Sequence, residues 1–198
     1  LGQEFTAIVD FAHTPNALQH TLETARELAA GGKVISVFGS AGLRDRQKRR
    51  MMAEISSRVA DLTVLTAEDP RTESLADILE EMANGARSQG GVEGNTFWRV
   101  PDRRDAIRFG LQQAQEGDVV IACGKGHEQS MCFGSTEYLW DDRTAMRAAL
   151  AAMSPTVQLI WAMAIFREAM PGILRWPAAA GTAISAEGQK AGLSCAAL

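Results

Sequence analysis

The sequence predicts an α/β fold, with a Rossmann-like, mostly parallel sheet of about six strands and helices on both faces. Two observations predict it. Short runs that are apolar at nearly every position occur at residues 5–9, 34–38, 62–65 and 119–122, which is typical of parallel strands buried on both faces. Amphipathic stretches with helix-capping residues separate these runs, and strands that alternate with helices indicate βαβ units.

Local signals support the first elements. Residues 5–9 (FTAIV) are apolar and partly β-branched, which favours a strand. A helix follows, because Thr14 is a good N-cap and Pro15 suits the first helical position. Residues 34–38 (VISVF) form the second strand. The residues expected on the buried face of the first helix, and the glycines that end it, are Leu18, Leu22, Ala25, Leu28, Gly31 and Gly32.

Two further helices surround the third strand, residues 62–65 (LTVL). The second of them begins at Ser74, because a capping hydroxyl followed by Asp77 in the first turn favours a helix N-terminus. The residues expected on the apolar sides of these two helices are Met51, Met52, Ile55, Val59, Leu75, Ile78, Leu79 and Met82.

The last elements repeat the pattern. Asp102 with Asp105 begins another helix, and residues 119–122 (VVIA) form a buried strand. A short strand near Tyr138 and a helix capped by Asp141 complete the fold.

Residues 1–150 carry this pattern, and we place a domain boundary near residues 150–154. Residues 151–198 are rich in alanine and show no sustained periodicity. We interpret them either as a docking segment or as a loose or non-native extension. Because the chain does not begin with Met, we expect a fragment or a processed product.

Composition disfavours several classes of protein. The net charge of −4 argues against a general nucleic-acid binder. Cys123, Cys132 and Cys195 form no CxxC pair, so we expect neither a disulfide framework nor a structural zinc site, and a reducing cytoplasm fits best. The longest apolar run, residues 157–166, is shorter than the ~20 residues that a membrane helix needs. We therefore expect a cytoplasmic protein that binds neither nucleic acid nor a membrane.

Unusual polar residues follow four of the predicted strands. The loops are DFAHTP (residues 10–15), GSAGLRDRQKRR (39–50), TAEDPRTE (66–73) and GKGHE (124–128). Each alone is also consistent with helix capping, a solvated charge run or local salt bridges. Parallel sheets bind ligands beyond the carboxyl ends of their strands. Four such loops at one edge therefore predict a composite binding site.

The residue types indicate anionic and zwitterionic ligands. Asp10 and His13 stand before a helix N-terminus, which favours anions and can face a nucleotide. Residues 44–50 hold several cations near the start of the next helix, where the helix dipole makes positive charge unfavourable. A bound phosphate or carboxylate would offset this charge. In residues 66–73 the acids suit an ammonium group, and Arg71 suits a carboxylate. The chain lacks a Walker A motif, and no GxGxxG follows the first strand, which disfavours a dinucleotide-binding domain.

In their order and spacing, VDFAHTP, FGSAGLRDRQKR, EDPRTE and GKGHE resemble the C-terminal domain of the Mur ligases, over about residues 5–150. The EDPRTE and GKGHE loops are most similar to those of the members that add the third, usually dibasic, residue of the peptidoglycan stem peptide. The AHTP loop is shared more widely in the family.

The resemblance implies an amide ligation that depends on ATP and Mg²⁺. The γ-phosphate would pass to a carboxylate of a UDP-N-acetylmuramoyl dipeptide, and the amine of a free amino acid would attack the acyl phosphate and release phosphate. The residues implied to hold the amino acid are Arg44, Glu68, Asp69, Arg71, Gly124 and Glu128. Those implied to lie beside the nucleotide are Asp10, Phe11 and His13, with Lys48 and Arg49 approaching its phosphates on domain closure.

Complete Mur ligases also contain an N-terminal UDP-sugar-binding domain and a central P-loop ATPase domain. The resemblance implies that these domains are the partners of this one, and that the central domain binds most of the ATP and Mg²⁺. We therefore expect no ligase turnover from this chain alone, and we assign it neither a metal ligand nor a certain catalytic residue.

The chain departs from the family pattern at three places. Glu68-Asp69 replaces the usual Asp-Asn before Pro-Arg, and the added negative charge disfavours diaminopimelate and favours lysine or ornithine. Arg71, in contrast, is the residue typical of diaminopimelate ligases. Leu43 and Phe11 replace a common Asp and a common Tyr. The acceptor amino acid therefore stays open.

Two alternative functions stay open. The chain could be a stand-alone module that senses an amino acid or a nucleotide. It could also be the corresponding domain of a folylpolyglutamate- or cyanophycin-type ligase, although the DPR and GKGHE loops together argue against this.

Overall fold

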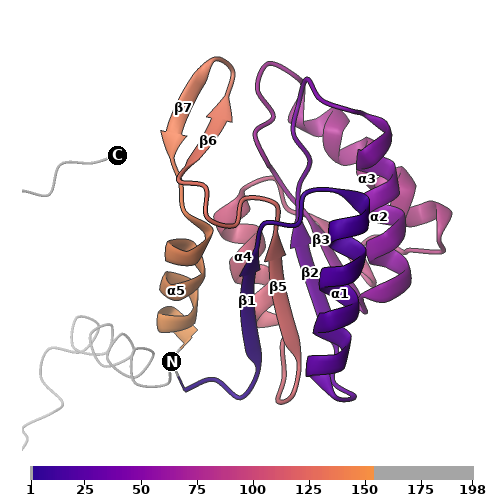
Figure 1. The fold of residues 1–198 in the computed structure, drawn as a ribbon, viewed down its shortest axis with the longest axis vertical. Helices are drawn as coiled ribbons and strands as arrows, with labels where there is room; N and C mark the ends of the chain where they lie inside the picture. The colour runs from indigo at the N-terminus through magenta and orange to yellow at the C-terminus, as the bar shows by residue number, and fades with distance from the viewer. Residues whose placement is uncertain (1, 154–198) are drawn as a thin grey trace, which may run out of the picture. The chain divides into compact units, whose positions relative to one another are not determined.

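The computed structural model describes residues 2–153 and contains a five-stranded parallel sheet and a separate two-stranded hairpin. The strand order in the sheet is β1-β5-β2-β3-β4, and all neighbouring strands are parallel. Their carboxyl ends therefore share one edge, the upper edge in Figure 1. The strands are β1 (Thr6–Asp10), β2 (Val34–Phe38), β3 (Leu62–Leu65), β4 (Phe97–Arg99) and β5 (Val119–Cys123), with β6 (Ser130–Phe133) and β7 (Thr136–Leu139) in the antiparallel hairpin.

Helices cover both faces of the sheet (Figure 1). Leu22 and Met52 belong to a core cluster on the face covered by α1, α2 and α3. Ile107 and Met146 belong to a second cluster, on the face covered by α4 and α5. The helices are α1 (Pro15–Ala29), α2 (Gln47–Val59), α3 (Leu75–Ser88), α4 (Arg103–Gln112) and α5 (Asp142–Met153).

The predicted fold class is confirmed. Both β2 and β5 are buried at every position, as expected for central parallel strands. The predicted caps also form: Oγ1 of Thr14 accepts the Ala17 N–H at 3.3 Å, and Oδ1 of Asp102 accepts the Asp105 N–H at 2.9 Å. Asp141 caps α5 in the same way, because its Oδ1 accepts the Thr144 N–H at 3.3 Å.

The main sheet has five strands, where the sequence predicts about six. The predicted strand near Tyr138 is β7, which pairs with β6 outside the sheet. All four residues of β7 are exposed, so it contributes to neither buried face of the main sheet. The edge strand β4, which the sequence analysis missed, has three residues and is too short to give a periodic signal.

Two residues predicted to be buried are exposed. The side chains of Leu28 and Met51 are 57% and 48% exposed. In α1, Ala29 takes the inward position that was assigned to Leu28, and in α2, Met52 is buried next to Met51. Successive helical residues are about 100° apart, so one step in sequence moves a side chain off the buried stripe.

A buried ion pair joins the two helices of the second face. The guanidinium of Arg103, the first residue of α4, donates from Nε and Nη2 to the two carboxylate oxygens of Asp142, at 2.7 and 2.6 Å. Trp140 Nε1 donates to the same carboxylate at 2.7 Å. The pair therefore fixes the start of α5 against the start of α4.

The proposed tail, residues 151–198, lies outside the described residues apart from the last turn of α5, and so does the apolar run 157–166. Within residues 2–153 no helix is long and apolar enough to cross a membrane.

Substitution of two leucines of α1 tests the placement of this helix. Leu22→Ala is expected to lower the free energy of unfolding by about 2–5 kcal/mol, because it removes a fully buried side chain and leaves a cavity. Leu28→Ala is the matched control and is expected to cost less than ~0.5 kcal/mol. Urea unfolding followed by circular dichroism measures both. Equal losses would contradict the placement.

Candidate amino-acid site at the carboxyl edge of the sheet

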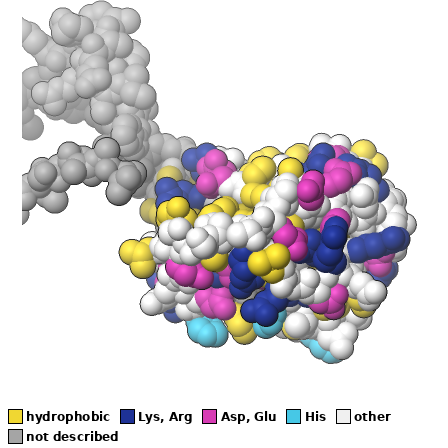
Figure 2. Space-filling model, turned by 90° about the horizontal axis from the view of Figure 1, so that it is seen from above, with side chains coloured by type: hydrophobic (Ala, Val, Ile, Leu, Met, Phe, Trp, Pro, Cys, Tyr) yellow, Lys and Arg dark blue, Asp and Glu magenta, His cyan; other side chains and the backbone are white. Residues whose placement is uncertain are grey.

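The strand order places the four polar loops side by side. The loops after β1, β5, β2 and β3 follow neighbouring strands in that order. Contacts join them: the Gly124 N–H donates to the Asp10 carbonyl oxygen at 3.2 Å, and the Gly42 N–H donates to the Asp69 carbonyl oxygen at 2.9 Å. Figure 2 shows this edge from above, with acidic and basic side chains interleaved across it. The composite site predicted from the sequence is thus geometrically possible.

The loop after β1 presents an aromatic surface. The ring of Phe11 is partly exposed and lies between two imidazoles, 4.6 Å from His13 and 4.9 Å from His127 between centroids. A β-carbon at Gly126 would collide with Phe11, so this close approach requires glycine. Oδ1 of Asp10 accepts the N–H of the neighbouring Ala12 at 2.7 Å. Asp10 therefore shapes the turn, whereas Phe11 and His13 are available to a flat ligand.

Arg71 connects the loop after β3 to the loop after β2. Its Nη1 donates to the Gly42 carbonyl oxygen at 2.8 Å. A β-carbon at Gly42 would collide with the Pro70 carbonyl oxygen. Arg44 follows two residues later and is exposed. The two guanidinium groups predicted to bind carboxylates thus come from two loops in direct contact.

Backbone strain is concentrated in these loops. Leu43, Asp69 and Arg71 adopt left-handed φ values of 55°, 42° and 52°. Non-glycine residues in this region cost of order 1–3 kcal/mol and persist where surrounding contacts impose them. Here the Leu43 N–H donates to Glu73 at 3.0 Å, and the Arg71 N–H donates to the Cys132 carbonyl oxygen at 3.1 Å.

Lys125 links the loop after β5 to the loop after β3. Its buried ammonium contacts both carboxylate oxygens of Asp69 at 3.0 Å and Oε2 of Glu128 at 2.6 Å. Burial disfavours the charge of Lys125, but the hydrogen bonds that its ammonium donates to Glu128 and Asp69 outweigh this effect and raise its pKa. Asp69 also accepts the Cys132 N–H at 2.9 Å. The extra negative charge at position 69 is therefore neutralised internally.

Glu68 differs from the other acids of the site. It is 6% exposed, and its Oε2 has no hydrogen-bond partner among the described residues. The side chain lies between Gly39 and Gly124, where a β-carbon on either glycine would crowd it. Burial raises the pKa of Glu68 to about 7, although the cations Arg103, Lys48 and Lys125 oppose this shift.

The two predicted phosphate-binding cations have different surroundings. Lys48 is partly exposed, and its Nζ donates to the His13 carbonyl oxygen at 3.3 Å. Arg49 is buried and contacts Glu73 at 2.5 Å, Glu81 at 3.0 Å and the Ala41 carbonyl oxygen at 3.2 Å. In this arrangement Arg49 holds α2 to α3 and the loop after β2.

The hairpin is a part of the site that the sequence did not reveal. Its β6 strand accepts the Arg71 N–H, and the Gly134 N–H donates back to the Arg71 carbonyl oxygen at 2.8 Å. It thereby supports the strained loop after β3. These contacts are between backbone atoms, so no side-chain pattern in the sequence could have indicated them.

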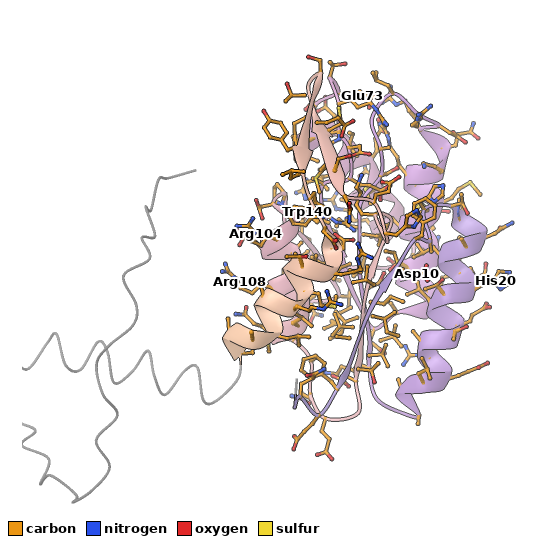
Figure 3. All side chains as sticks on the ribbon, turned by 60° about the vertical axis from the view of Figure 1, so that its left-hand side comes forward. Asp10, His20, Glu73, Arg104, Arg108 and Trp140 are labelled. Atoms are coloured by element: carbon orange, nitrogen blue, oxygen red, sulfur yellow. The ribbon has the colours of Figure 1, made fainter. Side chains whose placement is uncertain are left out.

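A second concave region lies away from the loops. A groove of about 580 Å³ runs between α4 and α5, and its lining includes alanines of α5 together with Trp140, Asp141, Arg104 and Arg108. In Figure 3 these two arginines point away from Asp10, on the opposite side from His20. None of the four polar loops contributes a residue to the lining of this groove, so we place the candidate site at the sheet edge.

The raised pKa of Glu68 predicts a pH dependence of stability. Because the folded state holds the proton up to about pH 7 and the unfolded state releases it near 4.5, the contribution of Glu68 to stability is fully present below 4.5 and is lost as the pH rises through 7. The slope is at most about 1.4 kcal/mol per pH unit. Glu68→Gln removes this loss, whereas Glu116→Gln, at an exposed position, retains it. Urea unfolding at several pH values measures it, and equal slopes in both variants would refute the assignment.

Comparisons with known proteins identify relatives of the chain. The family model described as Mur ligase, glutamate ligase domain matches residues 1–126. A protein of Roseiflexus sp. (strain RS-1), named UDP-N-acetylmuramyl-tripeptide synthetase, is 47% identical over 152 residues, covering 77% of this chain and 30% of that protein. A protein of Geobacillus thermodenitrificans (strain NG80-2), named UDP-N-acetylmuramoyl-L-alanyl-D-glutamate--2,6-diaminopimelate ligase, is 44% identical over 149 residues, covering 75% and 29%.

A solved structure of a UDP-N-acetylmuramoyl-L-alanyl-D-glutamate--2,6-diaminopimelate ligase shares the fold, with a TM-score of 0.68 and 35% identity, over 77% of this chain and 30% of that one. The chain thus spans about 30% of the length of these relatives. Since the family model covers more than half of its residues, the chain belongs to the Mur ligase family and corresponds to the C-terminal domain of its members.

Proposed function

We propose that this chain is the amino-acid-binding domain of an ATP-dependent ligase of peptidoglycan precursors. The ligase would add a dibasic amino acid (diaminopimelate, lysine or ornithine) to UDP-N-acetylmuramoyl-L-alanyl-D-glutamate in the cytoplasm. The observation that carries the proposal is that Arg71 and Lys125 join the loops after β2, β3 and β5 into one connected rim. The names of the relatives at 47% and 44% identity support the reaction.

The rim has the charges that a zwitterionic amino acid needs. Arg44 and Arg71 offer guanidinium groups for a carboxylate. Glu128 is paired with Lys125 yet partly exposed, so it offers negative charge to an ammonium group. Oε2 of Glu68 is unpartnered among the described residues and would accept a hydrogen bond from the same group, whose charge would favour the ionised form of this carboxyl. Gly124 has φ of 111°, and its missing side chain leaves room for Glu68. Asp69 acts indirectly, because Lys125 and Cys132 occupy its carboxylate.

The nucleotide would lie next to the loop after β1. Phe11 and His13 offer ring faces, Asp10 holds the turn, and Lys48 offers an ammonium group to phosphate. Arg49 would act through the position of α2, since its own contacts are internal. These residues would contact only part of a nucleotide and do not form a complete nucleotide-binding site.

ATP supplies the phosphoryl group that activates the substrate carboxylate, and we assign the binding of ATP and Mg²⁺ mainly to the central domain found in the family. In residues 2–153 no group of three or more His, Cys, Asp or Glu side chains is placed to hold a metal ion. The role of this chain's own residues is to bind and orient the incoming amine.

Binding of a dibasic amino acid is the first test. We expect one of meso-diaminopimelate, L-lysine and L-ornithine to shift the amide NMR signals of Arg44, Arg71, Gly124 and Glu128. Arg71→Ala should weaken this binding about tenfold or more, because it removes a charge-assisted contact. Arg147→Ala, an exposed arginine of α5, is the control and should not change it.

Other outcomes of this titration decide between the alternatives. Shifts at the same residues with L-glutamate alone would favour a folylpolyglutamate-type ligase. A stand-alone binding module would be favoured by tight binding of an amino acid or ADP, together with a gene that encodes no P-loop upstream of this chain. Shifts confined to the α4–α5 groove would contradict the assigned site.

Turnover is the second test. The purified chain with ATP, Mg²⁺, the UDP-linked dipeptide and amino acids should form no ADP above the background, because it supplies only the acceptor side of the reaction. A coupled ADP assay measures this, with a complete ligase of the family as the positive control. Substrate-dependent ADP formation that survives repurification would contradict the proposal that this chain only binds and orients the incoming amine.

A further inference from the structure

Arg103 contacts the backbone of the loop after β3 and the last residue of β5. Its Nη1 donates to the Ala67 carbonyl oxygen at 3.2 Å, and its Nη2 donates to the Cys123 carbonyl oxygen at 2.8 Å. Ala67 immediately precedes Glu68, and Cys123 immediately precedes Gly124. One side chain of α4 therefore spans the carboxyl ends of β3 and β5, which are separated in the sheet by β2.

The carboxylate of Asp142 fixes the orientation of this guanidinium. It accepts from Nε and Nη2 of Arg103 in a two-point contact, and Trp140 Nε1 supplies a third donor. The side chains of Arg103 and Asp142 are 1% and 0% exposed. A planar guanidinium held by two hydrogen bonds along one edge aims its remaining donors in fixed directions, which a lysine ammonium cannot do.

The comparison with Arg26 shows what a purely structural arginine does in this fold. Arg26 also binds two carbonyl oxygens, of Gly32 and Val59, and a carboxylate, of Asp61. These contacts lie at the opposite edge of the sheet, where β2 and β3 begin. No loop residue of the candidate site takes part in them.

We infer that Arg103 is a positioning residue for the amino-acid site, holding the loops after β3 and β5 at the separation at which Glu68, Asp69 and Lys125 form one rim. Asp142 and Trp140 act through it by fixing its plane. The identity of the ligand rests on the proposed function, whereas the effect on the loops does not.

The test compares Arg103→Lys with Arg26→Lys by amide hydrogen exchange. The N–H groups of Arg71 and Cys132 report on the rim, and the Val34 N–H, which donates to Asp61, reports on the opposite edge. Arg103→Lys should accelerate exchange at Arg71 and Cys132 by about tenfold or more and leave Val34 unchanged. Arg26→Lys should accelerate Val34 only.

A double variant keeps the test decisive if Arg103→Lys does not fold. In Arg103→Met/Asp142→Leu, apolar side chains of similar volume replace the ion pair, an exchange that is often neutral for stability. It should fold, which circular dichroism checks, with a lower urea midpoint because the Ala67 and Cys123 carbonyl oxygens and the Trp140 N–H lose their partners. It should show fast exchange at Arg71 and Cys132. It should also bind the amino acid at least tenfold more weakly, with ADP binding unchanged.

Three results would overturn the inference: exchange at Arg71 and Cys132 as slow as in the wild type, acceleration that is uniform across the sheet, or equal losses of amino-acid and ADP binding. If the wild type binds no amino acid, that result contradicts the proposed function but not the positioning role of Arg103. The exchange comparison still decides whether Arg103 positions the loops.

Discussion

The buried contact between Arg103 and Asp142 determines how the other parts of the site are arranged. Moving both charges out of water costs free energy, and a buried pair is tolerated when its remaining donors and acceptors are also satisfied. Here the Ala67 and Cys123 carbonyl oxygens and the Trp140 N–H complete the set. The same contacts that offset burial therefore also align β3, β5 and α5.

The charged side chains at the sheet edge differ in how deeply they are buried and in whether other residues of the chain neutralise them. Arg103 and Arg49 are buried and occupied by internal acids. Lys125 is buried but joins Asp69 to the more exposed Glu128. Arg44 lies at the surface and has no ion pair among the described residues. The charges held inside set the geometry, and the charges left near the surface are those available to a ligand.

Much of the fold followed from the sequence because its signals are local. The apolar runs of β2 and β5, the caps at Thr14 and Asp102, and the polar loops after the strands each depend on neighbouring residues. The adjacency of the four loops needed only the rule that parallel strands end at one edge.

What the sequence did not reveal depends on contacts between distant residues. Arg103 and Arg104 are adjacent at the charged start of a helix, and no feature of the neighbouring sequence distinguishes the buried arginine from the exposed one. For Arg49 the sequence likewise showed no sign of its internal contacts, because its partners Glu73 and Glu81 lie on another segment. The support that the hairpin gives to Arg71 is made by backbone atoms, which leave no mark in the residue pattern.

A crystal structure of this chain with a bound dibasic amino acid would show whether the loops after β2, β3 and β5 form one amino-acid site. We expect a ligand carboxylate within hydrogen-bond distance of Arg44 or Arg71, and a ligand ammonium group beside Glu68 or Glu128. A ligand seated in the groove between α4 and α5, with the rim empty, would contradict this expectation.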